Sequence, residues 1–281
     1  MTRRFQRCIT AGLLTLSLAA PGALAGSRIL ATGGATPIEG GGGGGITPWA
    51  LITGYGSSGE TGISAFATRV DVRDFRLDSA GLAVGWNDRL EASFARQALD
   101  VQPLDVTLKQ DVFGLKARVA GRLLYTAMPQ VSVGLQHKRN RSFDVPAALG
   151  AADDSGTDLY VSAAKLWFAA LFDRNLFANV TLRRTEANEI GLLGFDAAGE
   201  DASLVAEGTL AVFLDDRWVI GYEYRQKPDH LDAVTENDWQ DLFVAYFPSK
   251  RVSLVAARAM LDEIAGLPDQ DGWYLSIQAT L

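Results

Sequence analysis

Alternation of apolar and polar residues at every second position constrains this chain more than any other feature of its sequence. The alternation is clearest at the C-terminus, where polar residues separate five apolar ones: Trp273, Leu275, Ile277, Ala279 and Leu281. Such a stretch indicates a strand with one apolar face and one polar face. It suits the last strand of a soluble sandwich or a membrane-spanning barrel strand, which needs about 9–11 residues.

The same period of two recurs along the chain, and the polar faces carry charges. It is seen in six further segments: 89–94, 113–119, 131–136, 176–183, 204–212 and 217–227. A sandwich can also have a polar face, but the tryptophans fall mostly near expected strand ends: Trp49, Trp86, Trp167, Trp218, Trp239 and Trp273. Aromatic residues at strand ends are typical of the two interfacial girdles of a membrane barrel.

Residues 1–25 have the organisation of a secretory signal peptide. A basic start with Arg3, Arg4 and Arg7 precedes an apolar stretch from Cys8 to Ala20, and Ala23-Leu24-Ala25 forms a small-x-small cleavage site. We therefore expect export, cleavage after Ala25 and a final location in the bacterial outer membrane. An uncleaved anchor is the alternative.

Loss of this leader would change the chemistry of the chain. Cys8 is the single cysteine, so the mature protein would have no disulfide and no thiol chemistry. The formal net charge would move from −7 to about −10, which argues against nucleic acid as a partner. The rest of the chain has no apolar run of 18 residues, so no transmembrane helix is expected. The apolar strand faces must then pack on each other or face lipid.

Short and long connections alternate along the chain, as in barrels with short periplasmic turns and long external loops. We therefore predict an all-β fold, a transmembrane antiparallel up-and-down β-barrel. Long connections are expected near residues 100–110, 139–157, 185–202, 227–238 and 262–270. Eleven strands, with Trp49–Tyr55 and Thr61–Asp71 added, give thirteen, and Ser27–Thr32 could supply a fourteenth; 12 is the alternative if one upstream run is not a wall strand.

The expected organisation is a signal peptide at 1–25, a glycine-rich segment at 26–46 and a barrel at 47–281. Gly40 to Gly45 is a run of six glycines. No helix or Gly-Lys-Ser/Thr follows it, so a phosphate-binding loop is a poor interpretation. A flexible connector is the ordinary explanation. Close packing of backbone inside the lumen, or a first strand in this segment, are the other possibilities.

Several short motifs together resemble a known family. They are Ile29-Leu30-Ala31-Thr32-Gly33-Gly34, Pro48 to Gly56, Phe75 to Gly81, Lys109 to Gly114 and Val133 to Gln136. The chain resembles the bacterial envelope family called domain of unknown function 3034, over most of its mature length. The resemblance implies a Gram-negative outer-membrane setting. It supplies no activity and no catalytic residues.

The inward faces are expected to carry the functional side chains. Ten charged residues fall on predicted lumen-lining positions: Glu91, Lys116, Arg118, Lys165, Arg183, Glu207, Arg217, Glu223, Arg225 and Arg258. Buried charge is costly unless it is paired or hydrated. These residues therefore line either a narrow water-filled channel, with a basic strip that would favour anionic solutes, or an ion-pair network that closes a structural barrel. A surface enzyme or adhesin is the third alternative.

Catalytic, cofactor and metal sites are not expected. His137 and His230 are the two histidines, and neither has partners at metal-ligand spacing. A hydrolytic pair of His137 with Ser132 or Ser142 is conceivable, but the spacing does not select it. Asp153-Asp154-Ser155-Gly156 with Asp158 lacks the spacing of a calcium loop. We predict a non-enzymatic protein without cofactors.

The expected partners follow from the barrel. They are outer-membrane lipid, periplasmic chaperones and the barrel assembly machinery. The C-terminal strand resembles the recognition signal of outer-membrane barrels, although such signals usually end in an aromatic residue and this one ends in Leu281. The oligomeric state does not follow from the sequence.

Overall fold

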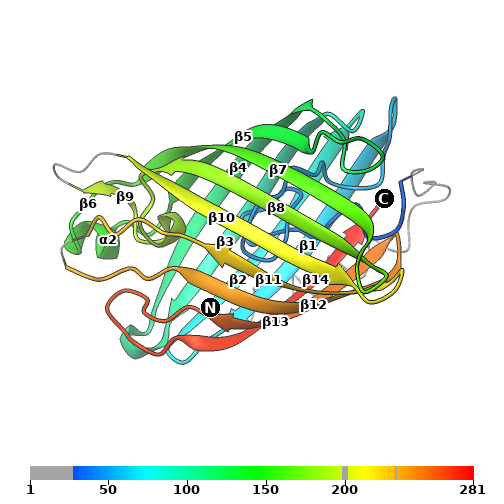
Figure 1. The fold of residues 1–281 in the computed structure, drawn as a ribbon. Coiled ribbons are helices and arrows are strands. Elements are labelled where there is room, and N and C mark those ends of the chain that lie inside the picture. The colour runs from blue at the N-terminus through cyan, green and yellow to red at the C-terminus, as the bar shows by residue number, and fades with distance from the viewer. Residues whose placement is uncertain (1–27, 198–201, 232) are drawn as a thin grey trace.

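The computed structural model describes residues 28–197, 202–231 and 233–281, and within them twelve strands form a closed antiparallel barrel. The predicted fold class is confirmed, with the lower of the two strand numbers. Neighbouring strands follow the chain order around the wall, and the last returns to the first (Figure 1). The wall consists of β1 (Thr61–Asp71), β2 (Phe75–Trp86), β3 (Leu90–Val101), β4 (Val106–Ala120), β5 (Gln130–Asn140), β7 (Ser155–Leu171), β8 (Arg174–Thr185), β10 (Ser203–Phe213), β11 (Trp218–Arg225), β12 (Trp239–Ser249), β13 (Val252–Met260) and β14 (Asp271–Thr280).

The terminal strand shows how the period of two builds the wall. Trp273, Leu275 and Ile277 are exposed on the outside of the barrel, while Tyr274 and Ser276 are buried inside. β14 pairs with β13 on one side and with β1 on the other, so it closes the barrel. The same alternation in the other strands gives an apolar outer surface suited to lipid and an inner surface that carries the polar groups.

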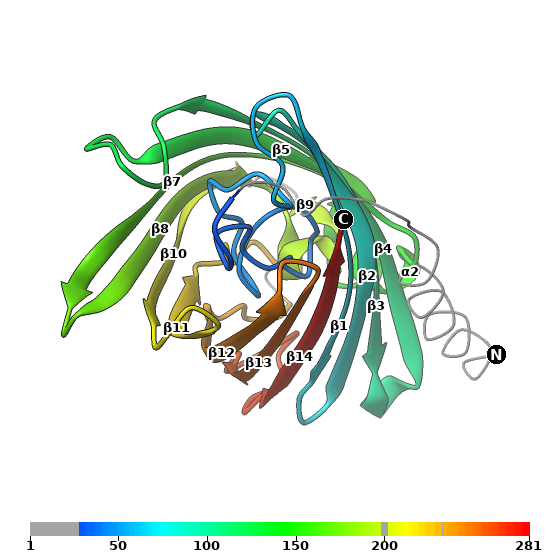
Figure 2. The same ribbon diagram turned by 90° about the vertical axis from the view of Figure 1, so that its right-hand side faces the viewer.

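Two of the three upstream runs are not wall strands, which explains why twelve replaces fourteen. Thr61–Asp71 forms β1 with the predicted bounds. Trp49–Tyr55 and the described part of Ser27–Thr32 form no strand and are not part of the barrel wall. Residues 28–56, which we call the plug, run through the lumen instead (Figure 2). The wall therefore begins at Thr61 rather than near residue 47. The proposed signal peptide lies outside the described residues.

The two ends of the barrel differ in their connections. At the short-turn end, β2 and β3, β7 and β8, β10 and β11, and β12 and β13 are joined by tight turns. The long-loop end carries the short helix α2 (Asp144–Ala148), the 3₁₀ turns η1 (Gln102–Leu104) and η2 (Asn188–Gly191), and the small sheet of β6 (Ala151–Asp153) with β9 (Phe195–Ala197). The connection expected at 100–110 is much shorter, because β3 and β4 extend to Val101 and from Val106. None of the described helices is long and apolar enough to span a membrane.

Tryptophans mark both rims of the outer surface. Trp86, Trp167 and Trp218 are exposed towards the short-turn end, and Trp273 is exposed towards the long-loop end. This placement fits interfacial girdles. The girdle assignment is wrong for Trp49 and Trp239, because both are buried inside the barrel. Trp49 belongs to the plug, and Trp239 begins β12 on an inward-facing position.

Candidate functional site: a lumen filled by the plug

The backbone of the glycine run is held by a buried carboxylate of the wall. Glu223 on β11 accepts hydrogen bonds from the backbone amides of Gly45 and Ile46 at 2.6 and 2.9 Å. Its other oxygen accepts from the Thr47 hydroxyl at 2.7 Å and the Trp49 indole at 3.3 Å. Buried backbone amides need partners, and successive amides in a turn form a natural anion site. One side chain therefore fixes residues 45–49 against the wall.

A second carboxylate holds the plug from the opposite strands. Glu91 on β3 accepts from the amides of Gly42 at 3.1 Å and Thr53 at 2.7 Å. Lys116 on β4 lies 3.0 Å from the Glu91 carboxylate, and its ammonium donates to the carbonyl oxygens of Gly42 and Leu51. The pair thus satisfies both the donors and the acceptors of two plug segments.

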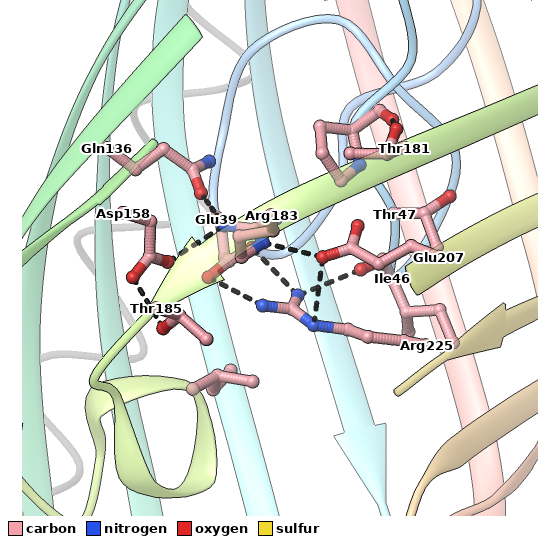
Figure 3. A network of polar contacts seen from close by, with 12 residues as sticks. Glu39, Ile46, Thr47, Gln136, Asp158, Thr181, Arg183, Thr185, Glu207 and Arg225 are labelled. Carbon is pink, nitrogen blue, oxygen red and sulfur yellow. Dashed lines mark hydrogen bonds and ion pairs between the residues drawn. The ribbon is translucent and has the colours of Figure 1, made fainter. Parts of the chain in front are cut away.

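The plug contributes one charged group of its own to a central network (Figure 3). The carboxylate of Glu39 is bound by the Arg225 guanidinium at 2.7 and 3.1 Å, by Arg183 at 3.4 Å and by Lys138. Arg183 on β8 also contacts Glu207 at 2.5 Å and Asp158 at 2.9 Å. All six charged side chains are almost completely buried.

The charges of this network balance, which makes its burial tolerable. Three acids, Glu39, Asp158 and Glu207, face three bases, Lys138, Arg183 and Arg225. A buried ion costs several kcal/mol to desolvate, and partners in good geometry offset that cost. Without Glu39 the wall would keep three bases against two acids. The plug therefore completes an electrostatic arrangement that the wall leaves unfinished.

Apolar packing fills the space around these polar anchors. The rings of Trp49 and Phe177 lie 4.5 Å apart, and they belong to one apolar cluster that includes both plug and wall. Two cavities between plug and wall, one beside Trp49 and one beside Ile38, each have a volume of only about 30 Å³. One water molecule needs roughly 10–15 Å³, so each cavity has room for two or three waters and is too small for a solute.

Close approach explains the glycines. A Cβ at Gly44 would lie 1.8 Å from Oε1 of Glu223, and a Cβ at Gly42 would lie 2.8 Å from the carbonyl oxygen of Leu51. Both positions admit no side chain unless a neighbour moves. Of the interpretations open from the sequence, packing inside the lumen is the one observed, and the flexible connector is wrong.

The structure separates the ten predicted lumen residues into two groups. Seven of them point inward from the wall: Glu91, Lys116, Arg118, Arg183, Glu207, Glu223 and Arg225. Arg118 lies at the short-turn rim, 2.7 Å from Asp88. The remaining six hold the plug at three places: the Glu91–Lys116 pair, Glu223, and the central network that contains Arg183, Glu207 and Arg225.

Three of the ten were placed wrongly. Lys165 shares the outward parity of the exposed Val161 and Trp167, and its ammonium donates to carbonyls in the 121–129 connection. Arg217 is exposed in the turn before β11. Arg258 is exposed on the outer face, 3.4 Å from Asp271. For Arg217, the alternation was continued beyond the end of a strand. For Lys165 and Arg258, both faces of the strand near the residue carry apolar side chains, so the alternation does not identify the inner face.

Several inward-facing charges were missed. Lys138 and Asp158 belong to the central network, and Asp241 is buried beside Glu223 with neither oxygen paired among the described residues. Lys138 has the parity of Ser132 and Gln136, so extending the period of two along β5 could have found it. Glu39 had no such signal, because the plug has no regular period.

Two buried carboxylates, Glu189 and Glu236, join the connections 186–191 and 233–238 at the long-loop end of the lumen, and we call these two segments the cover. The Lys227 ammonium lies 2.7 Å from Glu189 and 3.8 Å from Glu236, and the amide of Glu189 donates to Glu236 at 2.8 Å. Asp229 accepts from the Glu236 amide, and Lys227 lies over the Trp239 ring. Burial, with the nearby charge of Glu189, raises the pKa of Glu236 well above its ordinary value. Burial also raises the pKa of Glu189.

This cover is expected to loosen as pH rises. Because the folded pKa values are raised, the folded cover binds protons more tightly than the unfolded one. Its stability is greatest below the ordinary glutamate pKa, near 4.3, and falls as pH rises towards the raised values. Amide exchange of residues 188–191 and 233–238, corrected for the intrinsic pH effect, should be slower near pH 4.5 than near pH 8. Glu236→Gln should remove most of that difference, whereas Glu186→Gln on the outer face should leave it; an unchanged pH dependence in Glu236→Gln would refute this account.

The other candidate chemistries are not assembled. Ser132 points inward and donates to the Ala50 carbonyl, while His137 is exposed on the outer face beside Thr157, so they do not form a pair. Asp158 is buried in the central network, away from the exposed Asp153 and the partly exposed Asp154. No group of three potential metal-ligating side chains occurs among the residues that the structure describes. The absence of enzymatic activity stays a prediction.

Comparison with known proteins supplies a family and a fold. The family model described as a protein of unknown function, domain of unknown function 3034, matches residues 32–278. This confirms the resemblance found in the sequence. No curated protein matches the chain.

Solved structures with a similar barrel are porins and other outer-membrane proteins. The KdgM porin has 10% sequence identity and a TM-score of 0.51, covering 77% of this chain and 98% of its own. The NanC porin has 10% identity and a TM-score of 0.47, covering 78% and 98%. The outer membrane protein Omp33 of Acinetobacter baumannii has 8% identity and a TM-score of 0.46, covering 78% and 97%. At these identities the likeness shows the fold alone, that of an outer-membrane β-barrel.

Proposed function

Because this chain belongs to the family of domain of unknown function 3034, whose description names no activity, we propose a function from the geometry of the lumen. We propose that the protein is a channel of the outer membrane, closed in the conformation described, with residues 28–56 as its gate. In this proposal the short-turn end faces the periplasm, where such barrels have their short turns. Small polar solutes pass when the plug leaves the lumen.

The observation that carries this proposal is the polar character of the wall behind the plug. Glu91, Lys116, Glu223 and Arg225 all direct charged groups at the plug backbone. A plug that never leaves the lumen could be held by apolar side chains alone, because these are often at least as stabilising as buried ion pairs. A wall of this kind remains compatible with water once the plug is gone. Acids and bases on the wall nearly balance, so the structure does not favour the anion preference expected from the sequence.

A permanently closed structural barrel is the second candidate. The apolar cluster that joins the plug to the wall favours it, since parting Trp49 from Phe177 exposes apolar surface to water. The two candidates differ in one respect that can be measured. The gate must move in the first and never moves in the second.

A reversible crosslink between plug and wall tests the gate. The hydroxyl oxygens of Thr47 and Thr209 on β10 lie 2.9 Å apart, so Thr47→Cys with Thr209→Cys places two thiols in contact, and Cys8→Ser removes the natural cysteine. We expect the uncrosslinked protein to show intermittent conductance in planar bilayers. Oxidation should abolish the openings, and a reductant should restore them.

Single-cysteine variants control for the substitutions themselves. Each should conduct equally under oxidising and reducing conditions, because a single thiol cannot crosslink the plug to the wall. Conductance that persists in the fully crosslinked protein would place the conducting path elsewhere. Silence of the folded, uncrosslinked protein under all voltages would favour the permanently closed barrel.

A further inference from the structure

A basic patch lies on the outer wall near the long-loop end, on β3, β4 and β5. Arg96, Asp111 and Arg139 are directly opposite one another across the three strands. One step closer to the long-loop end, the backbone amide of Arg141 donates to the carbonyl of Lys109 at 2.7 Å. The basic patch is formed by Arg96, Lys109, Arg139 and Arg141.

The cations of this patch outnumber the acids around it. Asp111 lies 2.6 Å from Arg96 and 3.0 Å from Arg141. Asp154 lies 3.9 Å from Arg139, and the Lys109 ammonium has no hydrogen-bond or ion-pair partner among the described residues. The side chains of Arg139 and Arg141 are 64% and 55% exposed. Four bases of the patch therefore share two acids, while Asp100, on the same face of β3, accepts a hydrogen bond from the Thr107 hydroxyl at 2.6 Å.

The exposed ion pairs on other strands at the same rim are balanced one to one. On β1 and β2, Arg69 pairs with Asp78 at 2.7 Å and Arg76 pairs with Asp71 at 2.9 Å. On β13 and β14, Arg258 pairs with Asp271. In each of these pairs one acid compensates one base. A general requirement for charge at the membrane interface would not produce the difference between these strands and β3–β5.

An apolar surface lies next to the patch, towards the middle of the barrel. Phe94 and Phe113 occupy the next row towards the middle of the barrel, with ring centroids 5.0 Å apart, and Leu115 follows on β4. The forked guanidinium group can bind two oxygens of a phosphate at once, and basic clusters at membrane interfaces attract anionic lipids. A phosphate-bearing lipid would thus meet cations with its headgroup and the apolar wall with its acyl chains.

We propose that the basic patch binds the phosphate groups of a phosphorylated lipid in the leaflet around the long-loop end. Purified barrel in phosphatidylcholine nanodiscs would be titrated with bisphosphorylated lipid A and with the same lipid after phosphate removal, and binding followed by native mass spectrometry. The phosphorylated form should bind at least about tenfold more tightly, because the basic residues near the membrane surface attract its phosphate groups. Lys109→Glu with Arg139→Glu should abolish the difference.

Matched variants separate the site from general electrostatics. Arg89→Glu with Arg217→Glu makes the same change in charge on exposed residues at the short-turn end, and it should leave the preference intact. Lys109→Gln with Arg139→Gln gives a second, milder test, with an intermediate loss expected. Heat-modifiable mobility on gels verifies that each variant is folded.

Three results would overturn the proposal. The first is equal binding of the phosphorylated and phosphate-free lipids by the unmodified protein. The second is an equal loss of preference in the variants at the short-turn end. The third is full competition by inorganic phosphate at the concentration of the lipid, which would make the patch a site for the free anion rather than for a lipid.

Discussion

Replacing Arg183 by methionine is expected to lower the free energy of unfolding by about 3–5 kcal/mol, the usual cost of leaving a buried charge without its partner. Arg183 lies between Glu207 at 2.5 Å and Asp158 at 2.9 Å, and it also contacts Glu39 of the plug. Its loss would leave three buried acids facing two bases. Methionine keeps most of the apolar stem, so the loss of charge dominates the effect.

The measurement is denaturant unfolding of the refolded barrel, followed by tryptophan fluorescence and by heat-modifiable mobility. Arg184→Met is the matched control, because Arg184 is the next residue, is 56% exposed and pairs with Glu186 on the outer face. Exposed pairs contribute roughly 0–1 kcal/mol, so this variant should be nearly as stable as the unmodified protein. Adding Glu207→Gln to Arg183→Met restores the charge balance and should recover part of the loss. Equal effects of Arg183→Met and Arg184→Met would contradict the central role given to the network.

The wall of the barrel was predictable because its signal is local. Residues two apart in a strand share a face, so lipid on one side and polar groups on the other leave a period of two that can be seen in any single segment. β1 was predicted as Thr61–Asp71 with the observed bounds. The C-terminal alternation of Trp273, Leu275 and Ile277 gave the outward face of the closing strand correctly.

Faces were assigned wrongly where this period weakens. β13 is apolar on both faces through Val255, Ala256 and Ala257, so the sequence does not decide which way Arg258 points. Lys165 lies near the irregular end of β7, where pairing with β8 shifts register after Trp167. A residue at such a position can be buried by a neighbouring connection without entering the lumen, as Lys165 is.

The plug could not be predicted because its structure depends on contacts distant in sequence. Glycine has no side chain to show a face, so the run from Gly40 to Gly45 fits a connector and a tightly packed lumen segment equally well. What decides between them is Glu223, whose carboxylate occupies the space that a Cβ at Gly44 would need. Similarly, Glu39 gains its role from Arg225, 186 positions later in the chain. The period of two places charges on the lumen face, but it does not show that their partners lie in the N-terminal segment.

Removal of the plug is expected to have the largest effect on function. The wall is closed by strand pairing that does not involve residues 28–56, so it should still fold as a barrel. Four charged wall residues now bind the plug backbone: Glu91, Lys116, Glu223 and Arg225. Without the plug, these side chains would face a water-filled lumen. A deletion of residues 30–56 that keeps the leader should therefore change a barrel that is mostly closed into one that is open.

Single-channel recording of this deletion beside the intact protein tests most directly whether residues 28–56 close the lumen. Heat-modifiable mobility should first establish that the shortened barrel is folded. The account predicts long-lived conductance steps at each insertion of the shortened barrel, under conditions in which the intact protein is closed most of the time. A folded and inserted deletion variant that stays as silent as the intact protein would contradict it, because the wall alone would then close the lumen.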